Sequence, residues 1–397
     1  MIINILLISL SLCLVTNNYI VDGRMASISQ GENLELEKQL KLINKPPTKT
    51  IQTSFGHIVD CIDINKQLAF DNPLLKNHKI QLQPSFQVAR TTINEGQRSA
   101  RLSSSIGIEK VSCPRGTVPA RRRKKDDLIH AKQLSKITGM LTKDIPGSYG
   151  AAVKLNPGGT YYGIKGIIDT YNPIVASKEQ MTGAFIYLSN GPPDVANSII
   201  TGWQDTDEVY PEIHGDIKTH FFIAWADKNT SAGCYNLQCP GFVQTDKSIY
   251  IDSPVINTST YDGPQFDISL SIYLDPTTNN WWVRLQETDL GYFPAALFSD
   301  MSSANEGGWY GKTMTVVGNP SPPMGSGHLP DNNIRHSCYI RQMAFQDQSR
   351  GDIGPEFQLV SIYRDNPSCY DVQYDGYEDK SLGYAMLFGG PGGYCGN

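Results

Sequence analysis

From about residue 145 to the C-terminus, apolar and polar residues alternate in short segments separated by Gly, Pro, Asn and Asp. The clearest example pairs residues 266–274 with residues 281–286, joined by Asp-Pro-Thr-Thr-Asn-Asn at 275–280. Side chains alternate between the two faces of a strand, and this linker has the residues of a turn. The pattern therefore predicts a β-hairpin in which Trp281 and every second residue after it face the core.

Four further segments have the composition of strands: residues 160–170, 184–189, 218–226 and 357–364. Many short strands with few convincing helices favour an antiparallel sandwich over a barrel. No sequence repeat is visible. The prediction is an all-β fold, in which a mostly irregular pro-segment precedes a two-sheet antiparallel β-sandwich.

Residues 24–140 are polar, rich in lysine and poor in alternation. Within them, residues 32–42 carry leucines at helical spacing, which predicts a short amphipathic helix. The basic run Arg-Arg-Arg-Lys-Lys at 121–125 has two interpretations. It is either a solvated, flexible linker, which we favour, or a recognition site for a processing protease.

Residues 4–16 form an apolar run of signal-peptide length, too short to cross a membrane. No other run approaches ~18 apolar residues, so the sequence predicts secretion without a membrane anchor. The expected organisation is a signal peptide at 1–23, a pro-segment at 24–140 and a β-sandwich domain at 145–397. The formal charge of -5 gives no reason to expect a nucleic-acid partner.

Most cysteines should be paired in a secreted protein. Cys234 and Cys239 bracket four residues and suit a tight disulfide loop, and a disulfide between Cys369 and Cys395 would tie the last strands to the C-terminus. Cys61 and Cys113 could pair with each other, which leaves Cys338 as the odd cysteine.

Metal and cofactor sites are not expected. The spacing of the cysteines does not fit a zinc site, the histidines are scattered, and motifs for zinc hydrolases, serine hydrolases and phosphate-binding loops are absent. Asn229 and Asn257 each begin an Asn-x-Ser/Thr sequon, which makes them candidate glycosylation sites.

Two segments carry a family resemblance: Ile-Ile-Thr-Gly-Trp-Gln at 199–204 and Trp-Tyr-Gly-Lys at 309–312. Together with Gly-Cys-Tyr-Asn-Leu-Gln-Cys-Pro-Gly-Phe-Val-Gln at 233–244, they resemble the neprosin family of secreted plant glutamic peptidases, which cut after proline. Residues 59–71 and 113–119 resemble the activation peptide of that family. The resemblance covers most of residues 150–397 in order, and it also implies the disulfides Cys234–Cys239 and Cys369–Cys395.

In this family the two short segments read roughly Ile-Glu-Ala-Gly-Trp-Gln and Trp-Gly-Gly-Glu, and the two glutamates form the catalytic pair. Here Ile200 and Lys312 occupy those positions. An alkyl side chain cannot transfer a proton, and an ammonium group is a poor base. The resemblance therefore implies the scaffold of a peptidase without its acid–base pair.

Other residues near these positions could contribute to a site. Asp205, Asp207 and Glu208 follow Ile200, and Glu306 precedes Lys312 by six positions, which span ~20 Å in an extended strand. A bend or bulge could bring Asp207 or Glu306 back toward the site. The residues expected to line a ligand groove beside the former catalytic positions are Trp203, Gln204 and Trp309.

The favoured hypothesis is a secreted, catalytically degenerate peptidase homologue, outside the cell or in the cell wall, that binds proline-rich peptides or wall polymers. The first alternative is an active post-proline endopeptidase that works at acid pH with other carboxylates. The second is a carbohydrate-binding sandwich. The sequence predicts no cofactor and leaves the oligomeric state open.

Overall fold

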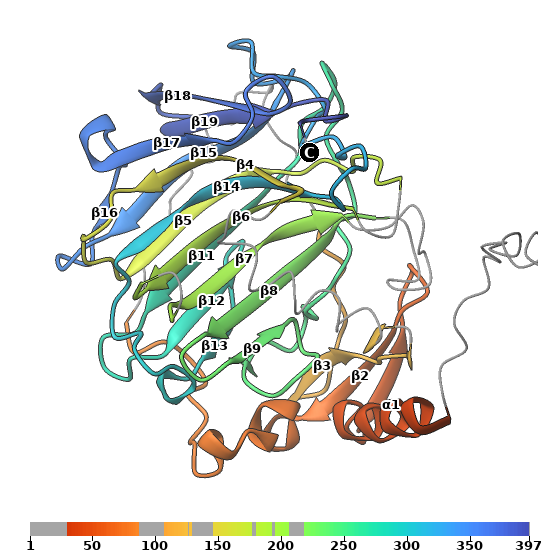
Figure 1. Ribbon diagram of the computed structural model, residues 1–397. Helices are drawn as coiled ribbons and strands as arrows, with labels where there is room; N and C mark the ends of the chain where they lie inside the picture. Colours follow the sequence, from red (N-terminus) through yellow and green to blue (C-terminus); the bar gives the residue numbers. More distant parts are fainter. Residues whose placement is uncertain are drawn as a thin grey trace, which may run out of the picture. The chain divides into compact units, whose positions relative to one another are not determined.

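The computed structural model describes residues 30–86, 107–125, 127–128, 146–176, 180–192, 195–205 and 218–396 (Figure 1). The predicted signal peptide lies outside these ranges. Helix α1 (Gln30–Ile43) contains the predicted amphipathic helix. Within the described ranges, no helix combines the length and the apolar character needed to span a membrane.

Two antiparallel sheets make up most of the chain after residue 146. In the larger sheet the strand order is β10-β13-β12-β11-β5-β15-β19-β18, with β16 beside β15. Its strands are β5 (Gly163–Asp169), β10 (Val243–Gln244), β11 (Asp267–Leu274), β12 (Trp281–Leu285), β13 (Thr288–Phe293), β15 (Cys338–Gln346), β16 (Asp352–Ile353), β18 (Asp371–Tyr377) and β19 (Tyr384–Gly389).

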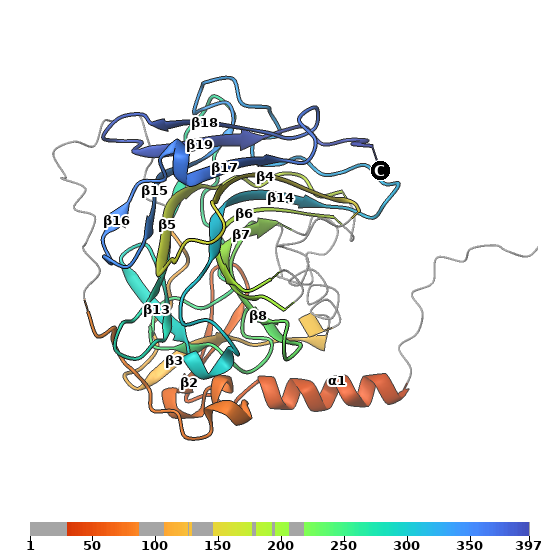
Figure 2. The same cartoon turned by 60° about the vertical axis from the view of Figure 1, so that its left-hand side comes forward.

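The smaller, seven-stranded sheet has the order β17-β4-β14-β6-β7-β8-β9. Its strands are β4 (Ser148–Leu155), β6 (Met181–Asn190), β7 (Asn197–Asp205), β8 (His220–Asp227), β9 (Ala232–Tyr235), β14 (Glu306–Met314) and β17 (Val360–Arg364). Figures 1 and 2 both show β4, β14, β6 and β7 lying next to one another in this sheet.

The two sheets pack face to face around one apolar core. Trp203 on β7 and Trp309 on β14 are fully buried in it. Each indole reaches β5 of the opposite sheet: Trp203 Nε1 donates to the Asp169 carbonyl oxygen and Trp309 Nε1 to the Lys165 carbonyl oxygen, both at 2.8 Å. The prediction of a two-sheet antiparallel sandwich is confirmed.

Most of the strand predictions are also confirmed. The hairpin forms as β11 and β12, with Leu274 opposite Trp281, and Trp281, Val283 and Leu285 are buried. The predicted segments 160–170, 184–189 and 218–226 correspond to β5, β6 and β8. Only the second half of segment 357–364 is a strand, because it begins with the 3-10 helix η6 (Phe357–Leu359).

The pro-segment forms a small sheet of its own. Strands β1 (Lys49–Gln52), β2 (Ile58–Asp63) and β3 (Thr117–Arg121) pair in that order. Besides η6, the described residues include the short 3-10 helices η1 (Ile64–Lys66), η2 (Leu68–Asp71), η3 (Pro73–Leu75) and, after β13, η5 (Ala295–Leu297).

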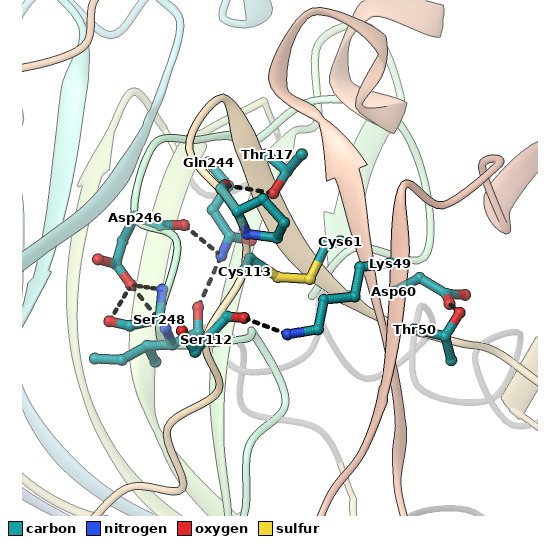
Figure 3. The surroundings of a disulfide bond; sticks show 12 residues. Lys49, Thr50, Asp60, Cys61, Ser112, Cys113, Thr117, Gln244, Asp246 and Ser248 are labelled. Carbon is teal, nitrogen blue, oxygen red and sulfur yellow. Dashed lines mark hydrogen bonds between the residues drawn. A yellow bond between two sulfur atoms is a disulfide. The ribbon is translucent and has the colours of Figure 1, made fainter.

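The disulfide Cys61–Cys113 links β2 to the segment 107–113 (Figure 3). That segment continues onto the sandwich, where Ile108 pairs with Val255 and Lys110 with Ile249 in antiparallel bridges. The disulfide therefore joins the small sheet to a stretch of chain that pairs with the sandwich domain.

The basic run does not form a solvated linker, as the sequence had suggested. Arg121 and Arg123 are both buried, and each places a guanidinium nitrogen 2.6 Å from the Asp252 carboxylate, which is fully buried. Arg122, which is half-exposed, pairs instead with Asp60 within the pro-segment. Arg121 is the last residue of β3, and Arg122, directly after it, is directed away from the side on which Arg121 and Arg123 meet Asp252.

Asp275, in the hairpin turn, forms a second attachment. Its carboxylate accepts hydrogen bonds from the Ser85 amide and hydroxyl, both at 2.6 Å, and from Gln81 Nε2 at 2.8 Å. Burial raises the pKa of Asp275, but these bonds and those from the turn outweigh it and lower the pKa to about 2. The ionised form is therefore favoured by the docked segment.

Replacing Asp252 with Asn should destabilise the protein by about 3–5 kcal/mol, because two buried guanidinium groups would lose the carboxylate that they share and would keep the buried Asp127, 3.6 Å from Arg121. Urea unfolding at pH 7 measures this change. The matched control is Asp371→Asn, which removes a half-exposed partner of Arg364 and should cost about 1 kcal/mol or less. Equal costs for the two variants would show that the buried ion pairs add little.

Asp275 should also make the docking of segment 81–85 sensitive to acid. A carboxylate whose pKa is lowered on folding contributes its full stability above the ordinary value of 3.8, and loses it as the pH falls toward about 2. Unfolding free energies measured between pH 5 and pH 2 should fall less steeply for Asp275→Asn than for the wild type. An unchanged slope would contradict this role.

Candidate functional site

The seven-stranded sheet has a second apolar face, directed away from the core. We call it the aromatic face. Its members are Ala152, Met181, Phe185, Tyr187, Ile200, Phe222, Ala224, Tyr235, Tyr310 and Met314, with Tyr363 packed against them. Phe185 stacks on Tyr310 with centroids 5.4 Å apart, and Phe222 stacks on Tyr235 at 5.6 Å. The face therefore presents a band of flat rings.

Ile200 lies in the middle of this face. It is fully buried, and its backbone pairs with Tyr187 on β6 and Ala224 on β8. The alternation of β7 places Ile200 here because Trp203 points into the core. The residue at the position where the resemblance places a glutamate is thus part of an apolar cluster.

The strand register separates Ile200 from Lys312. Tyr187, opposite Ile200, pairs on its other side with Gly308 of β14. Lys312 instead pairs with Gly183, which pairs with Gln204 on β7. Lys312 is therefore four residues beyond the level of Ile200, about 13 Å along the strand and about 10 Å across two strand spacings.

These offsets place the two α-carbons roughly 16 Å apart. Both side chains lie on the same face of the sheet. The position level with Ile200 on β14 is Gly308.

Two acids lie on or beside this face, Glu306 on β14 and Asp365 directly after β17. The Asp365 carboxylate accepts a hydrogen bond of 2.6 Å from the Gly150 amide at the β4 edge of the sheet. Glu306 accepts a hydrogen bond of 2.9 Å from the Tyr187 hydroxyl. Burial and the Glu306 carboxylate raise the pKa of Tyr187 well above its ordinary value, so its hydroxyl remains a donor.

The register brings Glu306 closer to Ile200 than Lys312 is. Glu306 is two residues from the level of Ile200, so their α-carbons are about 12 Å apart. The sequence had placed this acid outside the site. Its position becomes evident only when β14 is aligned with β7 through β6.

The other acids do not join it. Asp205 is buried on the side of β7 that carries Trp203 and faces the core. Asp207 and Glu208 lie outside the described residues. Across the part of the chain that the structure describes, no group of three or more His, Cys, Asp and Glu could hold a metal ion.

Trp203 and Trp309 do not line a groove, contrary to expectation. Both are core residues whose indole nitrogens bond to β5, because residues adjacent to an outward-facing position point inward. Gln204 does lie on the outward side. It is 3% exposed, and its Nε2 has no hydrogen-bond partner among the described residues.

The disulfides Cys234–Cys239 and Cys369–Cys395 form as expected, and Cys61 pairs with Cys113. Cys338 is free and buried. Asn229 and Asn257, the candidate glycosylation sites, are both exposed. Their modification remains a prediction.

The solved structures that resemble this chain include two peptidases and a GH16 enzyme. Scytalido-glutamic peptidase with a peptide-based transition-state analogue is 10% identical, covering 62% of this chain and 99% of the other, with a TM-score of 0.32. The Eqolisin-family peptidase SCP-B with the tripeptide Ala-Ile-His is 9% identical, with the same coverage and a TM-score of 0.31. A Bacteroides ovatus GH16 enzyme is 10% identical, covering 44% and 70%, with a TM-score of 0.25.

Two family models match the chain. The model described as neprosin activation peptide matches residues 50–155, and the neprosin model matches residues 178–391. The first match includes the small sheet of the pro-segment, and the second includes both positions occupied by Ile200 and Lys312. The chain belongs to the neprosin family.

Proposed function

We propose that this protein is a secreted, non-catalytic member of the neprosin family that binds proline-containing peptides on the aromatic face. The observation that carries the proposal is the environment of Ile200. An alkyl group stands where the family resemblance places a catalytic carboxylate, and Glu306 on β14 is two residues from its level. A glutamic peptidase needs two proton-handling groups within reach of one peptide bond.

The ring-lined surface supports a peptide ligand. Proline-rich segments adopt an extended left-handed helix that docks into aromatic-lined grooves, since its conformation is already ordered before binding. The stacked pair Phe185–Tyr310 and the edge-on ring of Tyr187 provide such a surface. Flat rings also suit sugars, so a wall polysaccharide is the alternative ligand.

Access to the face must be controlled. Its aromatic residues Phe185, Tyr187, Phe222, Tyr235 and Tyr310 are at most 4% exposed in the full chain. Binding therefore requires that the face be uncovered first, by rearrangement or by processing. The match to an activation peptide supports processing, and three disulfides support passage through an oxidising compartment.

The direct test incubates the purified protein, before and after limited proteolysis, with proline-containing peptides between pH 3 and pH 7. We expect binding after proteolysis and no cleavage.

Tyr310→Leu should weaken binding about tenfold, or about 1.4 kcal/mol, because it removes a stacking ring. Tyr377→Leu, an exposed ring on β18, is the matched control. Specific cleavage after proline would overturn the proposal, and binding of oligosaccharides alone would favour the alternative.

The strand register also predicts which substitution restores proton-handling groups. The variant Ile200→Glu places a second carboxyl group on the face, with its α-carbon about 12 Å from that of Glu306. We expect this variant to cleave slowly after proline at acid pH. Lys312→Glu alone should remain inactive. The control Ile200→Gln tests whether an ionisable group is needed, and Ile200→Glu combined with Glu306→Gln should lose the gain. Activity in Lys312→Glu would contradict the register argument.

A further inference from the structure

Part of the pro-segment belongs to the core of the sandwich. We call the described residues from 44 to 86 and from 107 to 128 the docked segment. Its buried residues Ala69, Leu75 and Ile108 belong to the same apolar cluster as Trp203 and Trp309. The further residues Phe70, Ile80 and Phe86 pack against that cluster. An interface of this kind resembles a domain core cut in half, which is typical of permanent complexes.

One arm of the docked segment, residues 107–113, shares its backbone hydrogen bonds with the loop that follows β10. The Val111 amide donates to the Ser248 carbonyl oxygen at 2.8 Å, and the Ile256 amide donates to the Gly107 carbonyl oxygen at 3.0 Å. Buried backbone groups need partners, so both sides of this contact would have to be satisfied again if the arm left.

The other arm attaches to the hairpin turn and to β13 through Gln81. The side-chain oxygen of Gln81 accepts hydrogen bonds from the Thr278 hydroxyl at 2.8 Å and from Asn280 Nδ2 at 2.9 Å. Its amide donates to the Tyr292 hydroxyl oxygen at 3.0 Å, and His78 Nε2 lies 2.7 Å from the same oxygen. Gln81 therefore joins the docked segment to the sandwich through both its side chain and its backbone.

The two arms are coupled to each other. The disulfide Cys61–Cys113 links them, and β2 pairs with β3 beside it. Linked sites hold more tightly than separate ones, because detachment of one arm leaves it close to its site while the other stays bound. Departure of both arms would also take Arg121 and Arg123 away from the fully buried Asp252 carboxylate, which is costly.

We infer that the docked segment stays bound to the sandwich as a second chain when the backbone is cut between residues 128 and 146. The processed protein is then a complex of two chains, and its partner surface is the one formed by the hairpin turn, β13 and the loop after β10. This inference goes beyond the proposed function and does not depend on its ligand. Within the described residues, the apolar members of the aromatic face come from the sandwich alone.

The experiment places the recognition sequence of a site-specific protease, flanked by flexible Gly and Ser residues, between residues 136 and 137 of the full chain. A reducing gel shows when cleavage is complete, and size-exclusion chromatography at pH 7 follows. Both chains should elute together at about 1 µM protein, which requires a dissociation constant well below that concentration. Elution of the docked segment apart from the sandwich overturns the inference.

Two variants on opposite sides of the contact test what holds the chains together. Dissociation constants of the cut protein are measured by serial dilution at a fixed urea concentration. Gln81→Ala should raise the constant about tenfold, because it removes hydrogen bonds to the hairpin turn. Asp252→Asn should raise it at least about a hundredfold.

The matched control for Gln81→Ala is Leu82→Ala, since Leu82 is its neighbour in the chain and is 65% exposed. This variant should leave the dissociation constant unchanged. Thermal melting of each uncut variant checks that it is folded. Equal constants for Gln81→Ala, Leu82→Ala and the unsubstituted cut protein, together with no effect of Asp252→Asn, would contradict the contacts on which the inference rests.

Discussion

Two indole hydrogen bonds between the sheets fix the orientation of the candidate site. Trp203 on β7 and Trp309 on β14 both cross the core to carbonyl oxygens of β5. Since strand side chains alternate, each bond fixes the face of every other residue on its strand. Ile200 and Gln204 must therefore face outward on β7, as must Glu306 and Lys312 on β14. A slip of one residue would turn Gln204 and Lys312 into the core and turn the two tryptophans onto the opposite face of the sheet.

The same constraint separates two kinds of chemistry on one surface. Ile200 lies among rings, with Tyr187 hydrogen-bonded to Glu306 on one side. Lys312 is two residues beyond Tyr310 on β14. It pairs with Gly183 of β6, which pairs on its other side with Gln204 of β7. The face therefore places an apolar centre near Glu306 and sets Lys312 apart from both along β14.

The pro-segment is joined to the sandwich by buried polar contacts as well as by apolar packing. The Asp252 carboxylate receives two arginines, and Gln67 exchanges hydrogen bonds with the Gln244 backbone. Such contacts are specific, because any one of them left unpaired in the interior would be costly. A pro-segment held in this way has a defined register on the domain that it covers.

The sequence by itself determined the features that depend on neighbouring residues. Period-two alternation marked β11 and β12, and short spacing or family pattern gave the disulfides Cys234–Cys239 and Cys369–Cys395. The identities of Ile200 and Lys312 are likewise properties of the sequence.

Tertiary structure decided which residues face each other. Arg121 could not be assigned to the interior until Asp252, 131 positions away, was placed beside it. The alignment of β14 with β7, which brings Glu306 near Ile200 and moves Lys312 away, arises only when β6 pairs with both, and no local pattern encodes that pairing.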